Sequence, residues 1–496
     1  MKHASGYQTM KMKCTLFSLF IMLLAGCVPS TNSKKVDIPD SEKVIKAQTE
    51  IIEADPSLQA VSVLPAKWWE LFNDQTLKDL ETQAVGSNLD LRASVVRIQE
   101  SQAQLGVANS ALLPSVSAES GYVRSRISEH SPMYMLGAPA ESSSTWTLGI
   151  RTGWELDLWG HLRHLSDSAR AQLEASTFGM QSVKVSVQGD VARTYLLIRG
   201  LQSQIVIVEE NRKIADNLVQ LTESRERNGI ATRYDTSAAR ADIASIQARI
   251  TQLEQQRDIL MNSLAMLLGK PPRELNTSLA YVQFPTMPKK IPVGLPSSLA
   301  KSRPDILQAE ARLRSAVADI GAAKADFYPR ISLNGNLGIQ AFELSDLGSW
   351  GSRQFSIGPS LYLPIFQGGR LERNLELSES RHQQAGIAYQ QTVLNAWREV
   401  DDALNAYATE QKRHTQLQIA VDQNKTALDV AQRGYQQGTV DFSAVLIARR
   451  TLLTSQSELT DCTTNTALSI VSLYRALGGG WSAELMQENS IGLGGV

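Results

Sequence analysis

Apolar and polar residues alternate one by one in several short stretches of this chain. One set of alternate residues comprises Trp146, Leu148, Ile150, Thr152, Trp154, Leu156 and Leu158. The residues between them include Arg151, Glu155 and Asp157. Because successive side chains of a strand point to opposite faces, such a strand has one apolar face and one face suited to water. This alternation is typical of strands in transmembrane β-barrels.

Three more stretches have the same alternation, although the one that opens at Pro114 is the weakest. The other two run from Ile331 to Gln340 and from Phe355 to Ile365. We expect lipid contact from Leu148, Ile150, Leu361 and Leu363, and a water-filled lumen beside Arg151, Glu155 and Ser360. A soluble sandwich with one buried face is the alternative, but long helical stretches between the strands favour the membrane interpretation.

Long proline-free stretches follow each pair of strands, at residues 160–227 and 368–437. At 1.5 Å per residue, a helix of either length would reach about 100 Å. Each stretch ends near a glycine, Gly229 or Gly438. Apolar residues recur at spacings of three and four from Ile243 to Leu267 and from Leu417 to Ala431. This spacing indicates coiled-coil packing, so we expect two long helical hairpins that extend the barrel into an aqueous compartment.

The two halves of the chain are related by a tandem duplication. Pro114 and Pro329 lie 215 positions apart, and Gly229 and Gly438 lie 209 apart, with matching residues around each pair. We therefore divide the mature chain into a first repeat (66–269), a linker (270–296), a second repeat (297–478) and a C-terminal tail (479–496). Each repeat reads helix, strand, strand and long helical hairpin, which predicts a mainly α fold with a membrane β-barrel sector.

The N-terminus has the pattern of an export signal. Lysines precede an apolar stretch that is too short to span a bilayer and that ends in Leu24-Ala25-Gly26-Cys27. These four residues resemble the lipobox of bacterial lipoproteins, which implies cleavage before Cys27 and acylation of that cysteine. Residues 1–26 are then a signal peptide and 27–65 a lipid-anchored, extended tether; an ordinary signal peptide is the alternative.

The cysteine content argues against a fold held by disulfides, and the net charge argues against a nucleic-acid-binding protein. Once the signal and the lipid are assigned, Cys462 is the one thiol left, so the mature chain has no intramolecular disulfide. The formal net charge of -1 gives no general attraction to nucleic acid.

Four strands are too few to close a membrane barrel, because the smallest known have about eight. Open strand edges are not tolerated in lipid. Copies of the chain must therefore associate, and physical reasoning alone permits a dimer with eight strands or a trimer with twelve.

Several motifs carry a resemblance to a known family. They are Trp68-Trp69, Arg303-Pro304-Asp305-Ile306, Phe327-Tyr328-Pro329-Arg330-Ile331-Ser332-Leu333 and Pro364-Ile365-Phe366-Gln367-Gly368-Gly369-Arg370. They resemble the TolC family, and more narrowly the outer-membrane lipoproteins of resistance-nodulation-division (RND) efflux systems. The resemblance implies a homotrimer with a 12-stranded β-barrel and a long periplasmic α-barrel, with an equatorial region between. It also implies a periplasmic adaptor protein and an inner-membrane RND-type pump as partners.

Catalytic constellations are not evident in the sequence. His161 and His164 lie three apart, but two histidines without a third ligand are a weak metal signal. We see no phosphate-binding glycine loop and no serine nucleophile motif. We therefore expect a passive conduit without cofactor or metal, and not an enzyme.

The two helix-to-helix turns are expected to form the periplasmic tip and to contact the adaptor. The tip residues are Gly229, Ile230, Ala231 and Thr232 in the first turn, and Gly438, Thr439 and Val440 in the second. A glycine at such a turn permits the left-handed backbone that ends a helix.

The gate is expected where the inner helices converge. Family members often carry carboxylates six and nine residues after the second tip glycine, where this chain has Ala444 and Ile447. The remaining gate candidates are Asp235, Arg233, Arg240, Asp441 and Arg449. Arginines that pair with the two acids would make an ionic gate, and Ile447 would make an apolar one. The two missing carboxylates favour the apolar gate.

The function that fits these features is the exit duct of a tripartite efflux pump for small molecules such as drugs or other toxic compounds. The alternatives are a type I protein-secretion duct and a non-conducting structural or adhesive stalk. The cargo cannot be read from this chain, because the pump would select it.

Overall fold

The computed structural model describes residues 41–61, 64–275, 279–294 and 303–479. The signal peptide, the lipobox with Cys27 and the C-terminal tail beyond residue 479 lie outside the described residues. Two compact units are present. One contains Glu100–Glu174 and Ala311–Ile387, and the other is drawn from Asp37–Gln99, Ala175–Glu310 and Ala388–Val496.

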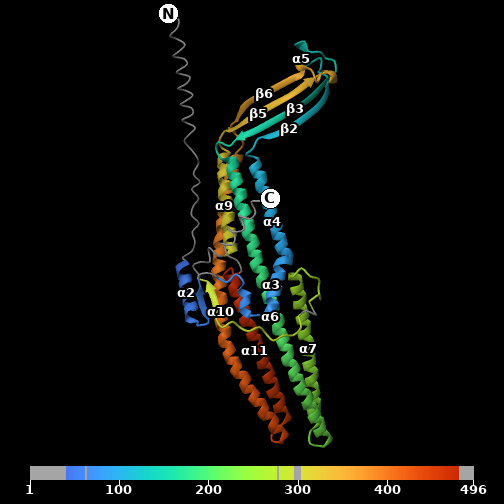
Figure 1. Cartoon of the computed structure of the whole chain (residues 1–496), viewed down its shortest axis with the longest axis vertical. Helices are drawn as coiled ribbons and strands as arrows, with labels where there is room; N and C mark the ends of the chain where they lie inside the picture. Colours follow the sequence, from blue (N-terminus) through green and yellow to red (C-terminus); the bar gives the residue numbers. More distant parts are fainter. Residues whose placement is uncertain (1–40, 62–63, 276–278, 295–302, 480–496) are drawn as a thin grey trace. The chain divides into compact units, whose positions relative to one another are not determined.

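The helices and strands follow the order expected for two repeats (Figure 1). The first repeat and the segment before it contain α2 (Ser41–Ala54), β1 (Leu58–Val61), η1 (Trp68–Phe72), α3 (Gln75–Ser87), α4 (Leu89–Ser110), β2 (Ser115–Ser125), α5 (Pro132–Met135), β3 (Ser143–Leu156), α6 (His161–Arg227) and α7 (Arg233–Leu267). The linker and second repeat contain β4 (Ile291–Gly294), α9 (Pro304–Ala325), β5 (Arg330–Ala341), η3 (Leu344–Asp346), η4 (Trp350–Ser352), β6 (Arg353–Tyr362), α10 (Arg370–Gln436) and α11 (Phe442–Ala476).

The four predicted strands form one antiparallel sheet in the order β2-β3-β5-β6. Its register places Ile150 opposite Leu337, and Ile331 opposite Leu361, so the apolar residues share one face. Ser332 pairs with Ser360 on the other face. The predicted alternation is confirmed, except that Leu158, Leu363 and Ile365 lie beyond the ends of their strands.

The polar face of the sheet carries its own contacts. Arg151 forms an ion pair with Glu119 at 3.0 Å across β3 and β2. The apolar face is open among the described residues, since Leu148, Leu337 and Leu361 are all exposed. This sheet therefore presents a continuous apolar surface to its surroundings, and β2 and β6 form its two edges.

The two long helical hairpins are also confirmed. Helices α6 and α10 contain 67 residues each, and α7 and α11 contain 35 each. This equality of lengths fits the duplication seen in the sequence. None of the described helices combines the length and the apolar composition needed to cross a membrane.

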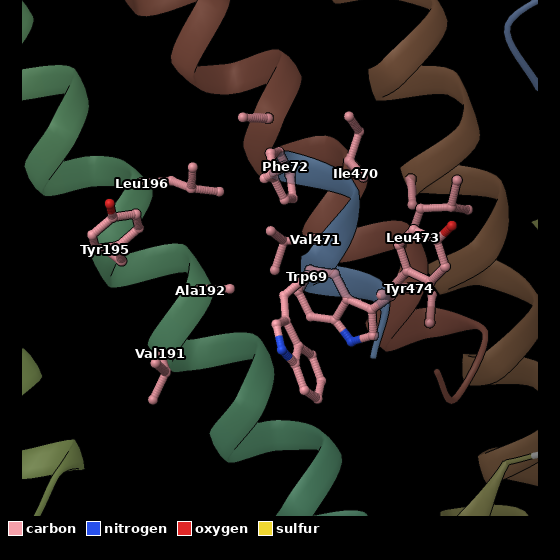
Figure 2. Packing of buried hydrophobic residues seen from close by; sticks show 14 of the residues in the cluster. Trp69, Phe72, Val191, Ala192, Tyr195, Leu196, Ile470, Val471, Leu473 and Tyr474 are labelled. Carbon is pink, nitrogen blue, oxygen red and sulfur yellow. The ribbon is translucent and has the colours of Figure 1, made fainter. Parts of the chain in front are cut away.

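The largest hydrophobic core of the second unit gathers around η1. Figure 2 shows side chains from η1, α6 and α11 meeting in one layer. Trp68 stacks on Tyr474 with ring centroids 5.3 Å apart, and Phe72 is fully buried. The Trp68-Trp69 motif, which carried part of the resemblance, therefore anchors the first repeat to the last helix of the second.

The prediction of an extended tether is wrong for residues 41–61. Residues Ser41–Ala54 form helix α2, and Leu58–Val61 form strand β1, which pairs in parallel with β4 of the linker. Gln48 is buried and donates a hydrogen bond from Nε2 to the carbonyl oxygen of Trp397 at 3.0 Å. Burial of Ile52 against this region stabilises the segment, which a free tether would leave in solvent.

Candidate functional site at the hairpin turns

The first hairpin turn joins α6 to α7 and is built from local backbone contacts. Gly229 has a φ of +71°, and the amide of Ile230 donates to the carbonyl of Arg225 at 2.8 Å. These are the features of a glycine-ended helix. Ile230 is 66% exposed, so the turn presents an apolar side chain to its surroundings.

Asp235 belongs to the N-terminal cap of α7. Its carboxylate accepts hydrogen bonds from the backbone amide of Thr232 at 2.9 Å and from the Thr232 hydroxyl at 2.8 Å. The Thr232 hydroxyl in turn accepts from the Asp235 amide at 3.3 Å, which completes a capping box. The negative charge also lies at the positive end of the helix dipole. The Asp235 carboxylate therefore stabilises the N-terminus of α7.

The second turn joins α10 to α11 and has the same length as the first. Gly438 has a φ of +77°, and the Thr439 amide donates to the carbonyl of Gly434 at 2.9 Å. A Cβ at Gly434 would lie 2.6 Å from the side chain of Val440, so this helix position needs a glycine for the turn to fold back. Asp441 is the N-cap residue of α11, but its side chain makes no capping hydrogen bond.

The gate candidates differ in exposure. Ile447 is 65% exposed, whereas Ala444 is partly buried. Arg233 and Asp441 are exposed beside their turns. An exposed isoleucine at this position is available to line a constriction, and no polar group of its own must be desolvated there.

Two of the expected gate arginines pair with other acids, which corrects the prediction. Arg240 binds Glu223 at 2.8 Å across the first hairpin. Arg449 forms a buried ion pair with Asp242, joining α11 to α7. These contacts take the place of the pairings with Asp235 and Asp441 that the ionic alternative would need, because Asp235 caps a helix and Asp242 lies on the buried side of α7.

Sequence reasoning missed Asp242, although a signal was present. The buried residues of α7 include Ala239, Asp242, Ile246 and Ile250, at spacings of three and four. An acid on an otherwise apolar seam needs a partner when the helix packs. Arg449 occupies the equivalent kind of position in α11, between Val445 and Leu452. The acid on the apolar seam of α7 and the arginine on the apolar seam of α11 could therefore have predicted this pair.

Burial changes the ionisation of Arg449. Desolvation, together with the neighbouring charge of Arg450, lowers the pKa of Arg449 to about 10. The guanidinium of Arg449 therefore remains protonated at neutral pH. Arg450 adds a second contact to Asp242 at 3.2 Å, but its own side chain is mostly exposed.

A further contact joins the two hairpins close to the turns. The guanidinium of Arg225 on α6 lies 4.4 Å from the ring centroid of Tyr435 on α10, and its Nη1 donates to the Tyr435 carbonyl at 2.8 Å. Tyr435 packs on Phe442, at the start of α11, with ring centroids 5.4 Å apart. This cation–π contact and the aromatic pair hold helices from both repeats together.

The two histidines that were considered as metal ligands have other neighbours. His161 Nδ1 lies 3.2 Å from the carboxylate of Asp326, and the ring of His164 lies against Gly321. Across the described ranges, no group of three histidine, cysteine or acidic side chains is arranged to hold a metal ion.

Known proteins resemble this chain in both sequence and fold. Residues 80–270 and 295–479 match the outer membrane efflux protein family. The chain is 32% identical over 432 residues to the pyoverdine export outer membrane protein OpmQ of Pseudomonas putida, covering 86% of this chain and 91% of that protein. It is 32% identical over 466 residues to the toluene efflux pump outer membrane protein TtgI of Pseudomonas putida, covering 93% and 97%. The solved outer-membrane channel OprN superposes with a TM-score of 0.84 at 29% identity, covering 92% of this chain and all of that one.

Proposed function

The chain belongs to the outer membrane efflux protein family, and from that premise we propose that three copies of it form the exit duct of a tripartite pump for small molecules. Its general function is that of an outer-membrane efflux channel, and its family consists of channels and not of enzymes. The trimer, the partners, the anchor and the gate are the parts that we add.

The observation that carries the assembly of several copies is the four-stranded sheet with one apolar face and two edges, β2 and β6. A sheet edge in hydrocarbon leaves backbone groups without partners, at a cost of several kcal/mol each. Pairing of β6 of one copy with β2 of the next removes both edges. Two copies would give eight strands and three copies twelve, both within the range of known membrane barrels, and we favour three in cyclic symmetry because the family resemblance implies a trimer.

The hairpin turns are the surface that we assign to a periplasmic adaptor. Ile230 and Tyr234 are 66% and 77% exposed at the first turn, and Thr439 is exposed at the second. Exposed apolar side chains beside polar ones are typical of contact sites between proteins. We assign energy supply and cargo selection to an inner-membrane pump of the RND type that acts through this adaptor.

Small molecules are the cargo class that we favour. The names of two relatives refer to pyoverdine export and toluene efflux. Both names describe compounds far smaller than a secreted protein. The duct itself has no catalytic part to play, and it conducts what its pump delivers.

The lipid anchor is assigned to Cys27 on the basis of the lipobox in the sequence. A single acyl chain binds a membrane only marginally, so the barrel supplies most of the attachment. Mass spectrometry of the mature N-terminus should find an acylated Cys27, and Cys27→Ala should lose that lipid while retaining part of the export activity. An unmodified Cys27 in the wild-type protein would refute the anchor.

A cellular accumulation assay tests the function. Deleting the gene should raise the intracellular level of a fluorescent dye that the intact strain exports, and supplying the wild-type chain should restore export. Failure of the wild-type chain to restore export of any pump substrate would argue against an efflux duct. If the deletion instead abolished secretion of a protein and left dye levels unchanged, the protein-secretion alternative would replace it.

A further inference from the structure

The apolar face of the sheet carries aromatic side chains near one of its ends. Tyr122 on β2 lies opposite Trp146 on β3, and the centroids of their rings are 4.4 Å apart. Trp146 belongs to the same alternate set as Leu148 and Ile150, so both rings lie on the apolar face. Tyrosine and tryptophan concentrate where the headgroups of a membrane meet its hydrocarbon, and this end of the sheet therefore fits a membrane interface.

This end of the sheet is the outer end in the proposed duct. Helix α6 follows β3 after a short loop, and α10 follows β6 in the same way, so both long helices begin at the opposite end of the sheet. The outer end therefore contains the end of β2, the start of β6 and the loops at residues 126–142 and 342–352. Figure 1 shows the short helix α5 of the first loop at this end.

Two exposed arginines lie on the apolar side of the sheet at its outer end. Arg124 follows Tyr122 by two residues on β2, so the two side chains share a face. Arg353 is the first residue of β6 and shares a face with Phe355 in the same way. A strand crosses a bilayer in about 9–11 residues. Because β2 has 11 residues and β6 has 10, both arginines lie at the level of the lipid headgroups.

Arg353 is held against an aromatic ring. Its guanidinium carbon lies 3.7 Å from the ring centroid of Trp350, and the tryptophan is 81% exposed. The face of the indole attracts the cation and orients it. The pair therefore presents an apolar surface and N–H donors side by side, which suits a molecule with an acyl chain next to an anionic group.

The partners of these two arginines differ from those of the other arginines in the sheet and its outer loops. The other three bind acids of this chain, in the pairs Arg126–Glu129, Arg151–Glu119 and Arg330–Asp326. Among the described residues, neither Arg124 nor Arg353 forms an ion pair, although the outer loops contain the acids Glu141, Glu343 and Asp346. Two cations on a membrane-facing surface are thus left to pair with an anion from outside the chain.

We propose that Tyr122, Arg124, Trp146, Trp350 and Arg353 form an outer rim that binds the phosphorylated headgroups of lipids in the outer leaflet of the membrane. The two guanidinium groups donate charge-assisted hydrogen bonds to phosphate oxygens, for which the planar fork of arginine is well suited. The three rings lie where the headgroups meet the acyl chains. The proposal rests on the proposed function, because an outer-membrane duct has lipid around its sheet.

A lipid titration followed by native mass spectrometry tests the outer rim. Full-length protein in detergent is mixed with increasing amounts of a diphosphorylated, acylated glucosamine disaccharide, and the bound lipids are counted at each concentration. The double variant Arg124→Gln/Arg353→Gln should bind this glycolipid about tenfold more weakly than the wild type, because it loses the charge and keeps the rings. Both side chains are exposed, so the variant should keep the yield and the gel-filtration volume of the wild type.

Three controls identify what is recognised. Arg126→Gln removes an arginine at the same end that already binds Glu129, so it should leave the affinity unchanged. The same glycolipid without its phosphates should bind the wild type about tenfold more weakly. Inorganic phosphate at the concentration of the glycolipid should not displace it, because phosphate alone cannot contact the rings. Equal affinity of the wild type and the double variant, an equal loss in Arg126→Gln, equal binding of the dephosphorylated lipid, or displacement by phosphate would each overturn the outer rim.

The dye-export assay separates this inference from the proposed function. A wild-type chain that fails to restore export would remove the proposed duct, whereas the titration with purified protein would still decide whether the outer rim binds phosphorylated lipid. Conversely, full export by the wild type together with equal lipid affinity in the double variant would leave the duct in place and remove the outer rim.

Discussion

Near the two turns, hydrogen bonds and ion pairs determine which charged side chains are available to form a gate. The Asp235 carboxylate accepts two hydrogen bonds from Thr232, and Arg240 and Arg449 are each held by another acid. Of the candidate residues, Ile447 is the one with a large exposed apolar surface. These contacts support a constriction that closes by excluding water and not by interlocking charges.

The gate prediction compares two substitutions in planar bilayers. Ile447→Ser should raise single-channel conductance, because a hydroxyl lets water enter the constriction. Asp235→Ala should leave conductance nearly unchanged and weaken only the helix cap, by about 0.5–2 kcal/mol. If Asp235→Ala opens the pore while Ile447→Ser leaves it shut, the gate is ionic.

Glu81 on α3 is a buried acid outside the gate. It is fully buried, and within the described residues neither carboxyl oxygen has a hydrogen-bond partner. Burial raises the pKa of Glu81 well above its ordinary value. The folded protein therefore keeps this carboxyl protonated at pH values where the unfolded chain has lost the proton.

This difference makes stability depend on pH. Below about pH 4, both states hold the proton, and above that value the unfolded state loses it first. The free energy of unfolding should then fall as pH rises, until the pH reaches the raised pKa of the folded state, by up to about 1.4 kcal/mol per pH unit. Glu81→Gln removes the titrating group, so its gain in thermal stability over the wild type should grow between pH 4 and pH 7. A gain that stays constant with pH, or that the exposed control Glu70→Gln reproduces, would contradict a buried neutral carboxyl.

At the scale of elements, periodicity predicted the sheet and the hairpins well. Alternation in β3, β5 and β6 gave the two faces, and the proline-free stretches gave α6 and α10 almost to the residue. These elements repeat one simple spacing over many residues, so the pattern is strong. The pattern also predicts which residues lie on each face of the sheet and of the helices.

Other elements depended on partners that are distant in the sequence. Strand β1 pairs with β4, with Leu58 opposite Ile291, and four residues carry too little pattern to reveal such a pair. Helix α2 carries an apolar set with Ile51 and Ile52, but a short amphipathic helix is stabilised mainly by what it packs against. The Asp242–Arg449 pair similarly requires knowing which two seams meet.

The strand register yields a paired prediction. Leu361 lies on the apolar face opposite Ile331, and Ser360 lies on the polar face opposite Ser332. An arginine on the lipid face costs about 2–4 kcal/mol at the membrane midplane and about 0–1 kcal/mol near its interfaces, whereas the lumen tolerates charge. Because Leu361 is the last residue but one of β6, we expect a cost below the midplane value. Leu361→Arg should therefore reduce the yield of assembled oligomer in outer membranes, measured by gel filtration after extraction, and Ser360→Arg should not. Equal behaviour of the two variants would mean that the assignment of faces is wrong.

For the whole molecule, membership of the outer membrane efflux protein family fixes the class of function. The sequence predicted that class through motifs such as Trp68-Trp69, whose side chains pack in the hydrophobic core around η1. Cargo identity could not be predicted in the same way, because in the proposed assembly the pump selects the cargo. The same limit applies to the proposed adaptor, for which this chain would supply only a surface.

The two open edges of the sheet require several copies of the chain to close a barrel, and the trimer that we propose is the central claim of the account. Native mass spectrometry of the full-length protein, released from detergent micelles, measures it directly. We predict one dominant species that contains three chains and dissociates to single chains when the detergent conditions unfold the barrel. A dominant species of one or two chains, prepared from protein that remains folded and active in export, would contradict the trimeric duct.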